Sequence, residues 1–316
     1  MRALVAPDKF KGTIAAGEVA AAVAAGLEQA GAEADLCPIA DGGEGTASIL
    51  LAAGGGTWHE AEAADPLGRP VECRFALLGD GATAVVEVAE ASGLWRLGED
   101  ELAPIAADTR GTGELVAAAV EAGATRLLLA CGGSATTDGG AGATTAFDPT
   151  TIEITCLCDT RVSFLEAAGV FAAQKGAGEA EVAALEARLV ALAAELPHDP
   201  TRLPFTGAAG GLAGGFWARG ARLVSGADHV LGAIDFDRRL AGADLVVTGE
   251  GRLDRTSLRG KGVGEVLGRA LRTGVPCHAI VGERSLTAEE ESAAGFASVR
   301  SAGTAAELSE AGRRLA

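Results

Sequence analysis

A repeated alternation of short apolar runs and amphipathic helices constrains this chain most, because loops rich in glycine and carboxylates follow several of the runs. Residues 4–6 read as a buried strand, Thr13 and Gly31 delimit a helix with one apolar face, and residues 36–39 read as the next strand. A β-α-β unit of this kind has parallel strands joined by a right-handed crossover. The order returns at residues 113–131, 238–248 and 266–281. It predicts an α/β fold built on a parallel sheet.

Two stretches interrupt this alternation. Residues 57–63, 71–78 and 82–88 read as strands with no helix between them, and residues 178–195 read as an alanine-rich helix. We therefore expect a doubly wound parallel-sheet domain with a second, smaller α/β domain inserted into it. The ranges expected for the doubly wound domain are 1–56, 105–147 and 226–316, and those for the inserted domain are 57–104 and 148–225.

Charge and cysteine usage narrow the range of partners. The chain has 26 basic and 43 acidic side chains and a net charge of −17, so we expect neither nucleic acid nor a membrane as a partner. The six cysteines show no C-x-x-C spacing and are typical of buried thiols in a reducing compartment. No signal peptide is recognised, and the apolar run after Glu18 is too short to span a bilayer. We expect a cytoplasmic protein that binds small molecules, with its oligomeric state left open.

Four loops follow expected parallel strands and combine glycine with carboxylates. In an open parallel sheet, ligands bind outside the carboxyl ends of the strands, so these loops are expected to converge on one cleft. The loops are residues 7–13, 40–46, 132–142 and 249–254.

Lysine is rare in the chain and lies beside flexible backbone. Only four of the 26 basic residues are lysines, and they lie next to glycine-rich or loop segments. A compact positive charge beside bare backbone suits a phosphate or carboxylate ligand. The four are Lys9, Lys11, Lys175 and Lys261.

Standard nucleotide and hydrolase motifs are missing. Residues 260–262 lack the flanking residues of a P-loop, the glycine spacing of residues 262–268 does not fit a dinucleotide fingerprint, and no histidine falls in the four loops. The lysines, glycines and carboxylates of the loops instead suit phosphoryl transfer. This reaction needs donors for phosphate oxygens, carboxylates for Mg²⁺, and a base for an attacking hydroxyl.

The loops resemble the bacterial glycerate kinases, and the resemblance runs in order over nearly the whole chain. It implies ATP-dependent phosphorylation of D-glycerate, usually at the 2-hydroxyl to give 2-phosphoglycerate, and a two-domain α/β fold with a cleft between the domains. The chain departs from that family's usual pattern at Thr137, at residues 160–164 and 172–173, and by a shortening near residues 147–152. The matching motifs are residues 6–12, 40–46, 65–69, 90–94, 111–115, 132–136, 138–142, 174–177, 207–212 and 248–254.

Each candidate residue receives one role in this reading, with ATP and Mg²⁺ as the cofactors. The catalytic candidates are Asp8, Lys9, Lys11 and Asp138. The substrate-binding candidates are Arg69, Ser134, Lys175, Gly210 and Gly211. The nucleotide-binding candidates are Gly132, Gly133, Gly139, Gly140, Gly249, Gly251 and Lys261. The candidate metal ligands are Asp41, Glu44, Glu250 and Asp254.

Asp8 is the first choice for the catalytic base, and Asp138 is the second. An alcohol must lose its proton as it attacks, and protein kinases use a positioned aspartate for this task. The neighbouring lysines are expected to favour the ionised form of Asp8.

Two alternatives to a kinase function stay open. One is a sugar-acid-binding or regulatory protein of the same fold without turnover, and the other is a dehydrogenase, which the missing dinucleotide fingerprint disfavours.

Overall fold

The computed structural model describes residues 1–10, 14–258 and 260–316, which form two compact units. Unit 1 comprises residues 1–41 and 227–316, and unit 2 comprises residues 42–226. Unit 2 therefore stands, in sequence, between the two segments of unit 1. The expected α/β class is confirmed, but the inserted unit is the longer of the two, whereas a smaller insertion was expected.

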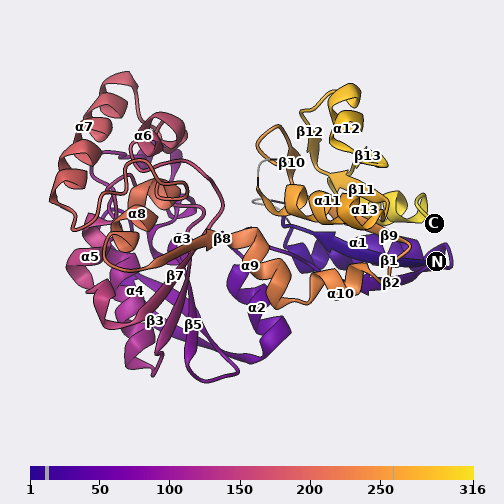
Figure 1. The fold of residues 1–316 in the computed structure, drawn as a ribbon, viewed down its shortest axis with the longest axis horizontal. Helices are drawn as coiled ribbons and strands as arrows, with labels where there is room; N and C mark the ends of the chain where they lie inside the picture. The colour runs from indigo at the N-terminus through magenta and orange to yellow at the C-terminus, as the bar shows by residue number, and fades with distance from the viewer. Residues whose placement is uncertain (11–13, 259) are drawn as a thin grey trace. The chain divides into compact units, whose positions relative to one another are not determined.

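Unit 1 is built on a five-stranded, wholly parallel sheet (Figure 1). Buried aliphatic side chains fill the central strands, as expected for a sheet covered on both faces. In spatial order the strands are β13 (Ser298–Ser301), β11 (Cys277–Val281), β9 (Leu245–Gly249), β1 (Arg2–Pro7) and β2 (Glu33–Leu36).

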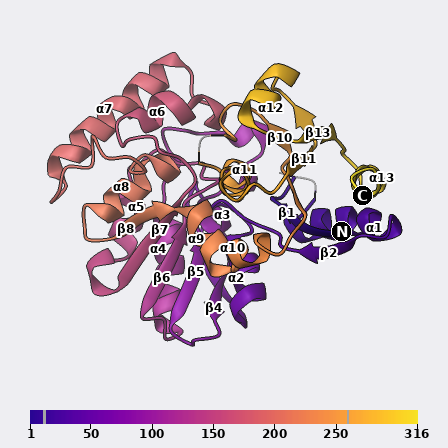
Figure 2. The ribbon, with the colours of Figure 1, turned by 45° about the vertical axis from the view of Figure 1, so that its right-hand side comes forward.

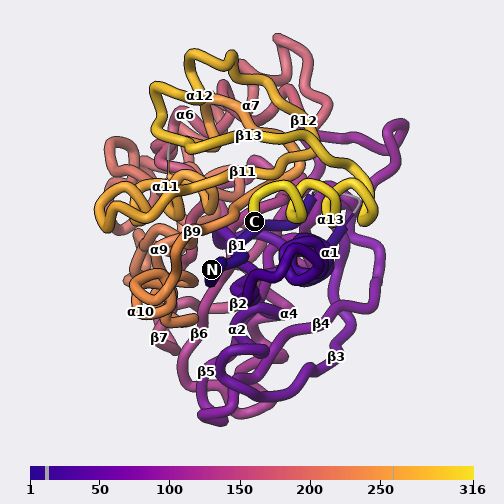
Figure 3. The backbone as a smooth tube through the Cα atoms, turned by 90° about the vertical axis from the view of Figure 1, so that its right-hand side faces the viewer, coloured from indigo at the N-terminus to yellow at the C-terminus, as the bar shows by residue number. Residues whose placement is uncertain are grey.

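The helices of unit 1 include a closely packed pair, α1 and α13 (Figure 3). An ideal Cβ placed on Gly26 of α1 would lie 1.8 Å from the Ser309 carbonyl oxygen of α13, so only glycine allows this approach. A short two-stranded sheet joins β10 (Arg252–Leu253) to β12 (Glu283–Arg284). The helices are α1 (Ala16–Gln29), α9 (Gly226–Ala233), α10 (Phe236–Leu240), α11 (Gly262–Thr273), α12 (Ala288–Ala294) and α13 (Ala305–Arg313).

Unit 2 contains a six-stranded mixed sheet. Its first three strands are antiparallel neighbours, and the last four run parallel to one another. In spatial and sequence order they are β3 (Gly56–Ala64), β4 (Pro70–Leu78), β5 (Thr83–Glu87), β6 (Arg126–Ala130), β7 (Glu153–Cys158) and β8 (Arg222–Ser225).

Several helices accompany this sheet, and α6 and α7 pack beside each other around a small apolar cluster of their own (Figure 2). The α-helices are α2 (Thr46–Gly54), α3 (Val88–Ser92), α4 (Arg110–Glu121), α5 (Ala141–Ala146), α6 (Glu166–Phe171), α7 (Glu179–Glu195) and α8 (Leu212–Trp217). The 3-10 segments are η1 (Leu94–Arg96), η2 (Glu99–Glu101), η3 (Pro149–Thr151), η4 (Ala173–Lys175) and η5 (Ala208–Gly211).

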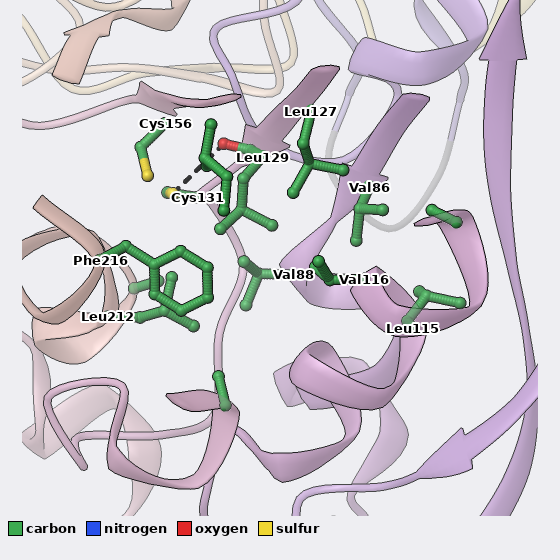
Figure 4. Close-up of a cluster of buried hydrophobic side chains, with 14 of the residues drawn as sticks. Val86, Val88, Leu115, Val116, Leu127, Leu129, Cys131, Cys156, Leu212 and Phe216 are labelled. Carbon is green, nitrogen blue, oxygen red and sulfur yellow. Dashed lines mark hydrogen bonds between the residues drawn. The ribbon is translucent and has the colours of Figure 1, made fainter. Parts of the chain in front are cut away.

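The main core of unit 2 joins the sheet to α4 and α8. Leu127 and Leu129 of β6, Leu115 and Val116 of α4, and Phe216 of α8 belong to one buried cluster (Figure 4). Burying aliphatic side chains of this size contributes about 1.5–3 kcal/mol each. This core holds β6 and its following loop in place.

The structure divides the chain differently from the expected domain ranges. Residues 105–147 were expected with the doubly wound domain, but β6 pairs with β5 and β7 and so lies in the sheet of unit 2. Local alternation of strand and helix is the same in both sheets, so it does not show which strands pair. The expected strand at residues 36–39 is also displaced, because β2 ends at Leu36.

The start of the first helix lies partly outside the described residues, which exclude the expected cap, Thr13. In the described part, Ala15 is the N-cap of α1, and its backbone N–H donates to the Glu18 carboxylate at 3.0 Å. Of the helices in the described residues, none is long and apolar enough to cross a membrane.

Candidate functional site

The carboxyl ends of the strands in unit 1 carry three carboxylates that influence one another. Asp8 follows β1, Glu250 follows β9, and Asp41 follows the segment after β2. The Asp8 side chain is buried, and its Oδ1 accepts a hydrogen bond from the Lys9 backbone N–H at 2.6 Å. The structure thus brings together residues from three of the four expected loops.

Burial sets the acid–base properties of this acidic cluster. It raises the pKa of Asp8 to about 7, with the Asp41 charge adding to the effect and Lys9 opposing it. It likewise raises the pKa of Glu250 to about 7, against a hydrogen bond from Ser257. Lys9 favours the ionised form of Asp8, as expected, but loss of solvation and the Asp41 carboxylate outweigh it, so the pKa is raised overall.

The first turn of α11 meets the Asp8 carboxylate. An ideal Cβ placed on Gly262 would lie 3.3 Å from Asp8 Oδ2, and Lys261 is the N-cap of this helix. A helix N-terminus stabilises negative charge beside it. In the described part of the chain, the buried Oε1 of Glu250 has no hydrogen-bond partner. Unit 1 therefore has a carboxylate oxygen available for a ligand.

Asp254, another expected metal ligand, lies in a self-contained turn. Its Oδ1 accepts hydrogen bonds from Thr256 N at 2.7 Å and Thr256 Oγ1 at 2.6 Å. Burial raises the pKa of Asp254, but these hydrogen bonds outweigh it and bring the pKa below its ordinary value. One of its two oxygens is therefore occupied by the turn.

The remaining candidates of unit 1 have structural contacts or lie outside the described residues. An ideal Cβ on Gly249 would lie 1.9 Å from the Ile280 carbonyl oxygen, so glycine is required between β9 and β11. The Gly251 carbonyl accepts a hydrogen bond from Glu283 N at 2.8 Å. Lys11 is not among the described residues.

In unit 2, the carboxyl ends of β5, β6 and β7 lie at the same edge of the sheet. Two glycines after β6 meet the loop that precedes α2. An ideal Cβ on Gly132 would lie 2.5 Å from the Gly43 Cα, and one on Gly133 would lie 2.5 Å from Glu44 Oε1. Glu44 therefore lies directly over the backbone of Gly133.

Lys175 is buried next to the same glycine-rich loop. Its Nζ donates to the Thr136 carbonyl oxygen at 2.5 Å and to Ser134 Oγ at 3.4 Å. Burial lowers the pKa of Lys175 to about 8, against the attraction of Asp138 and Asp159. A buried ammonium near the end of β6 offers positive charge for an anion.

Asp138 has its oxygens occupied by protein donors. Its Oδ2 accepts from Thr109 N at 3.0 Å, Thr109 Oγ1 at 2.7 Å and Gly142 N at 3.0 Å, while Oδ1 accepts from Gly140 N at 3.1 Å. These bonds tie the start of α4 to the start of α5. The geometry makes Asp138 an anchor of that loop and leaves it poorly placed to accept a substrate proton.

Gly210 and Gly211 pack closely against the backbone of residues 136–139. Gly139 N donates to the Gly210 carbonyl oxygen at 3.0 Å, and an ideal Cβ on Gly210 would lie 1.9 Å from the Thr136 carbonyl oxygen. An ideal Cβ placed on Gly211 would lie 3.0 Å from the Gly139 Cα. The close backbone packing accounts for glycine at these positions.

Arg69 is half exposed and already paired with acidic side chains. Its Nε lies 2.5 Å from Asp65 Oδ2, and its Nη1 contacts Glu101. Binding a substrate carboxylate would therefore compete with two protein carboxylates.

Two further carboxylates at the carboxyl ends of the unit 2 strands were not predicted from the sequence. Glu87 ends β5 and is buried, and Asp159 follows β7 and interacts with Lys175. Both are carboxylates at a strand end, which is the signal used for the four loops. They were missed because no glycine-rich run follows them directly.

The expected metal ligands divide between the two units. No group of three or more histidine, cysteine, aspartate or glutamate side chains within the described residues is arranged to hold a metal ion. The donor chemistry nevertheless fits Mg²⁺, which prefers carboxylate oxygens and water. Asp41 and the unpartnered Oε1 of Glu250 supply such oxygens in unit 1.

The fold and these side chains define the class of an α/β enzyme without a P-loop. Residues 3–149 and 146–314 match the model of the glycerate kinase family. The chain belongs to the glycerate kinase family, which confirms the resemblance seen in its loops.

Relatives and a solved structure agree with this membership. The chain is 36% identical over 307 residues to a glycerate kinase of Bacillus subtilis, covering 83% of this chain and 79% of that protein. It is 34% identical over 303 residues to a glycerate 2-kinase of Escherichia coli, covering 83% and 80%. A crystal structure provisionally described as a glycerate kinase 2 from Salmonella typhimurium LT2 matches with a TM-score of 0.82 and 31% identity, covering 100% of this chain and 97% of that one.

Proposed function

We propose that this protein transfers the γ-phosphate of ATP to D-glycerate and gives 2-phosphoglycerate. The observation that carries the proposal, beside the family membership, is the buried Asp8 at the end of β1, next to the first turn of α11. Phosphoryl transfer to an alcohol needs a base at the hydroxyl and donors for phosphate oxygens. Unit 1 supplies both kinds of group at one edge of its sheet.

Asp8 accepts the proton of the attacking hydroxyl in this proposal. A base works best when its pKa lies near the operating pH, and burial raises the pKa of Asp8 to about 7. The substrate oxygen then bonds to the γ-phosphorus while the bond from that phosphorus to the bridging oxygen of ADP breaks. Lys9, Lys11 and the first turn of α11 are the proposed donors to the transferring group.

Asp41, Glu44, Glu250 and Asp254 are the proposed ligands of Mg²⁺, directly or through water. The ion would supply positive charge that neutralises phosphate oxygens. Asp41 and Glu250 are the stronger candidates, because they interact with Asp8 and because Glu250 Oε1 has no hydrogen-bond partner within the described residues. Asp254 uses one oxygen in its own turn.

The anionic parts of the substrates require positive or backbone donors. Lys175 and Ser134 are the proposed contacts of glycerate in unit 2, where Lys175 is a buried ammonium. Arg69, Gly210 and Gly211 complete this proposed group. The proposed nucleotide-binding residues are Lys261 and the loop glycines Gly132, Gly133, Gly139, Gly140, Gly249 and Gly251.

The cytoplasm is the proposed compartment. All six cysteines are free and buried, which suits a reducing environment.

A coupled assay of ADP release tests the proposal. Purified protein with ATP, Mg²⁺ and D-glycerate should release ADP in proportion to glycerate consumed, and 2-phosphoglycerate should accumulate. ADP release that needs no glycerate would point to a different acceptor. Absence of ADP release together with tight glycerate binding would support the sugar-acid-binding alternative instead.

A further inference from the structure

A buried carboxylate of unit 2 caps a helix that has no cap of its own. Glu87 is the last residue of β5 and is only 7% exposed. Its carboxylate accepts hydrogen bonds from Gly45 N at 3.0 and 3.1 Å and from Ala47 N at 2.8 Å. Gly45 is the N-cap of α2 and provides no side-chain hydrogen bond. Glu87 therefore replaces the missing cap from a distant strand.

The capped loop carries Glu44. Glu44 precedes Gly45, whose φ of 93° is in the left-handed region. On its other side the loop packs against the backbone after β6, since Gly132 and Gly133 leave no room for side chains against Gly43 and Glu44. The loop that carries the Glu44 carboxylate is thus restrained from two directions. One is the pair of amides held by Glu87, and the other is the glycine pair after β6.

The chemistry of this arrangement depends on a charged acceptor. A buried carboxylate is stabilised by converging backbone N–H groups, and charge-assisted hydrogen bonds are about twice as strong as neutral ones. An amide side chain at position 87 would lose the charge and set an NH₂ group in place of one acceptor oxygen. The loop would then lose part of its restraint, although the sheet and core below it would stay unchanged.

We propose that Glu87 is a positioning residue that sets the place of the Glu44 carboxylate at the carboxyl edge of β6. The proposal rests on the proposed function, in which Glu44 takes part in phosphoryl transfer. It assigns Glu87 no contact with substrate. It states that the effect of Glu87 on turnover passes through Glu44.

A double-mutant cycle separates this role from a merely structural one. Glu87→Gln is expected to lower kcat at least ~10-fold, as is Glu44→Gln, each with a smaller change in KM for ATP. In the Glu44→Gln background, adding Glu87→Gln should change kcat by less than about 3-fold, because the positioned group is already disabled. Multiplicative effects of the two substitutions would overturn the proposal.

Glu114→Gln is the matched control. Glu114 also accepts a hydrogen bond from a backbone N–H, that of Ala64 at 2.8 Å. Ala64 is the last residue of β3 and is not part of the loop that carries Glu44. This variant should keep kcat within about 2-fold of the wild type, because its hydrogen bond serves only local structure. A similar loss of kcat in Glu114→Gln and Glu87→Gln would show that any lost carboxylate contact has this effect, and would overturn the proposal.

Amide hydrogen exchange measured by NMR gives a readout that does not need activity. The amides of Gly45 and Ala47 should exchange at least ~10-fold faster in Glu87→Gln than in the wild type, with the core strand β6 unchanged. Unchanged exchange at both amides would overturn the proposal. If the wild type showed no kinase activity, the proposed function would fail, while this measurement would still decide whether Glu87 holds the loop.

Glu87→Asp keeps the test informative if Glu87→Gln does not fold. The aspartate retains the charge but withdraws it by one methylene, so it should fold and still lose at least ~10-fold in kcat through the displaced loop. Turnover within about 2-fold of the wild type would overturn the proposal.

Discussion

The two units place polar residues at the same structural position, the carboxyl ends of parallel strands, but they differ in how many protein hydrogen bonds their carboxylates accept. In unit 1, carboxylates crowd together, and burial raises the pKa of both Asp8 and Glu250 to about 7. In unit 2, burial lowers the pKa of Lys175 to about 8, while Asp138 and Glu87 accept several hydrogen bonds from the protein.

The difference shows how structural carboxylates can be told from reactive ones. Asp8 and Asp138 both lie in loops that follow parallel strands, yet Asp138 accepts four hydrogen bonds within the described chain. For Asp8 Oδ2, the structure records a close approach to Gly262. A carboxylate whose two oxygens both accept hydrogen bonds from the protein holds a loop, whereas a buried one with a raised pKa can accept a proton.

Replacing Asp8 is the change with the largest expected effect. Asp8→Asn keeps the size of the side chain but removes its basicity, so kcat should fall by ~10²-fold or more, with little change in ATP binding. Steady-state kinetics and nucleotide titration measure the two quantities. If the variant kept more than about a tenth of the wild-type rate, the base would have to be sought among the other carboxylates, such as Asp254.

The buried lysine of unit 2 should give stability an unusual pH dependence. The unfolded chain holds the Lys175 proton up to the ordinary pKa of 10.5, whereas the folded chain releases it near 8. Stability due to this group should therefore rise with pH between about 8 and 10.5, by roughly 1 kcal/mol per pH unit, and should be independent of pH below and above that window. Urea unfolding of the wild type and Lys175→Met, compared at several pH values, isolates the contribution. A difference that stays constant with pH would show that the ammonium does not titrate this way.

Asp138→Asn tests the anchoring role. It removes charged acceptors from Thr109 and Gly142, so the free energy of unfolding should fall by about 2 kcal/mol or more. The kcat of the fraction that remains folded should stay within about 10-fold of the wild type, unlike that of Asp8→Asn. Urea denaturation and kinetics on the same preparation give both numbers. A loss of kcat as large as that of Asp8→Asn, with unchanged stability, would return Asp138 to the catalytic group.

The smallest expected difference in kcat is between two variants of unit 1, Asp41→Asn and Asp254→Asn. Asp41→Asn should lower kcat at least ~10-fold and raise the Mg²⁺ concentration needed for half-maximal rate, since it removes a carboxylate oxygen next to Asp8. Asp254→Asn should change kcat by about 2-fold and cost about 1 kcal/mol of stability through its turn. Mg²⁺ titrations of both variants decide the point. Equal effects would keep Asp254 among the ligands.

The sequence by itself determined the class of fold, the family and several of the strands and helices. Apolar periodicity reports local burial, so β3, β4, β5 and α7 were recognised within a residue or two. The glycine and carboxylate loops were also visible, because a close backbone approach leaves glycine in the sequence. Family membership followed from the same loops.

Only the tertiary structure decided which strands share a sheet and which carboxylates are already occupied. β6 joins the sheet of unit 2 because its backbone pairs with β5 and β7, a long-range choice that local alternation does not encode. The fates of Asp8 and Asp138 depend in the same way on distant partners, Asp41 for one and Thr109 for the other. Desolvation and hydrogen-bond satisfaction are properties of three-dimensional surroundings, so two aspartates that both lie in loops after parallel strands came to have different chemistry.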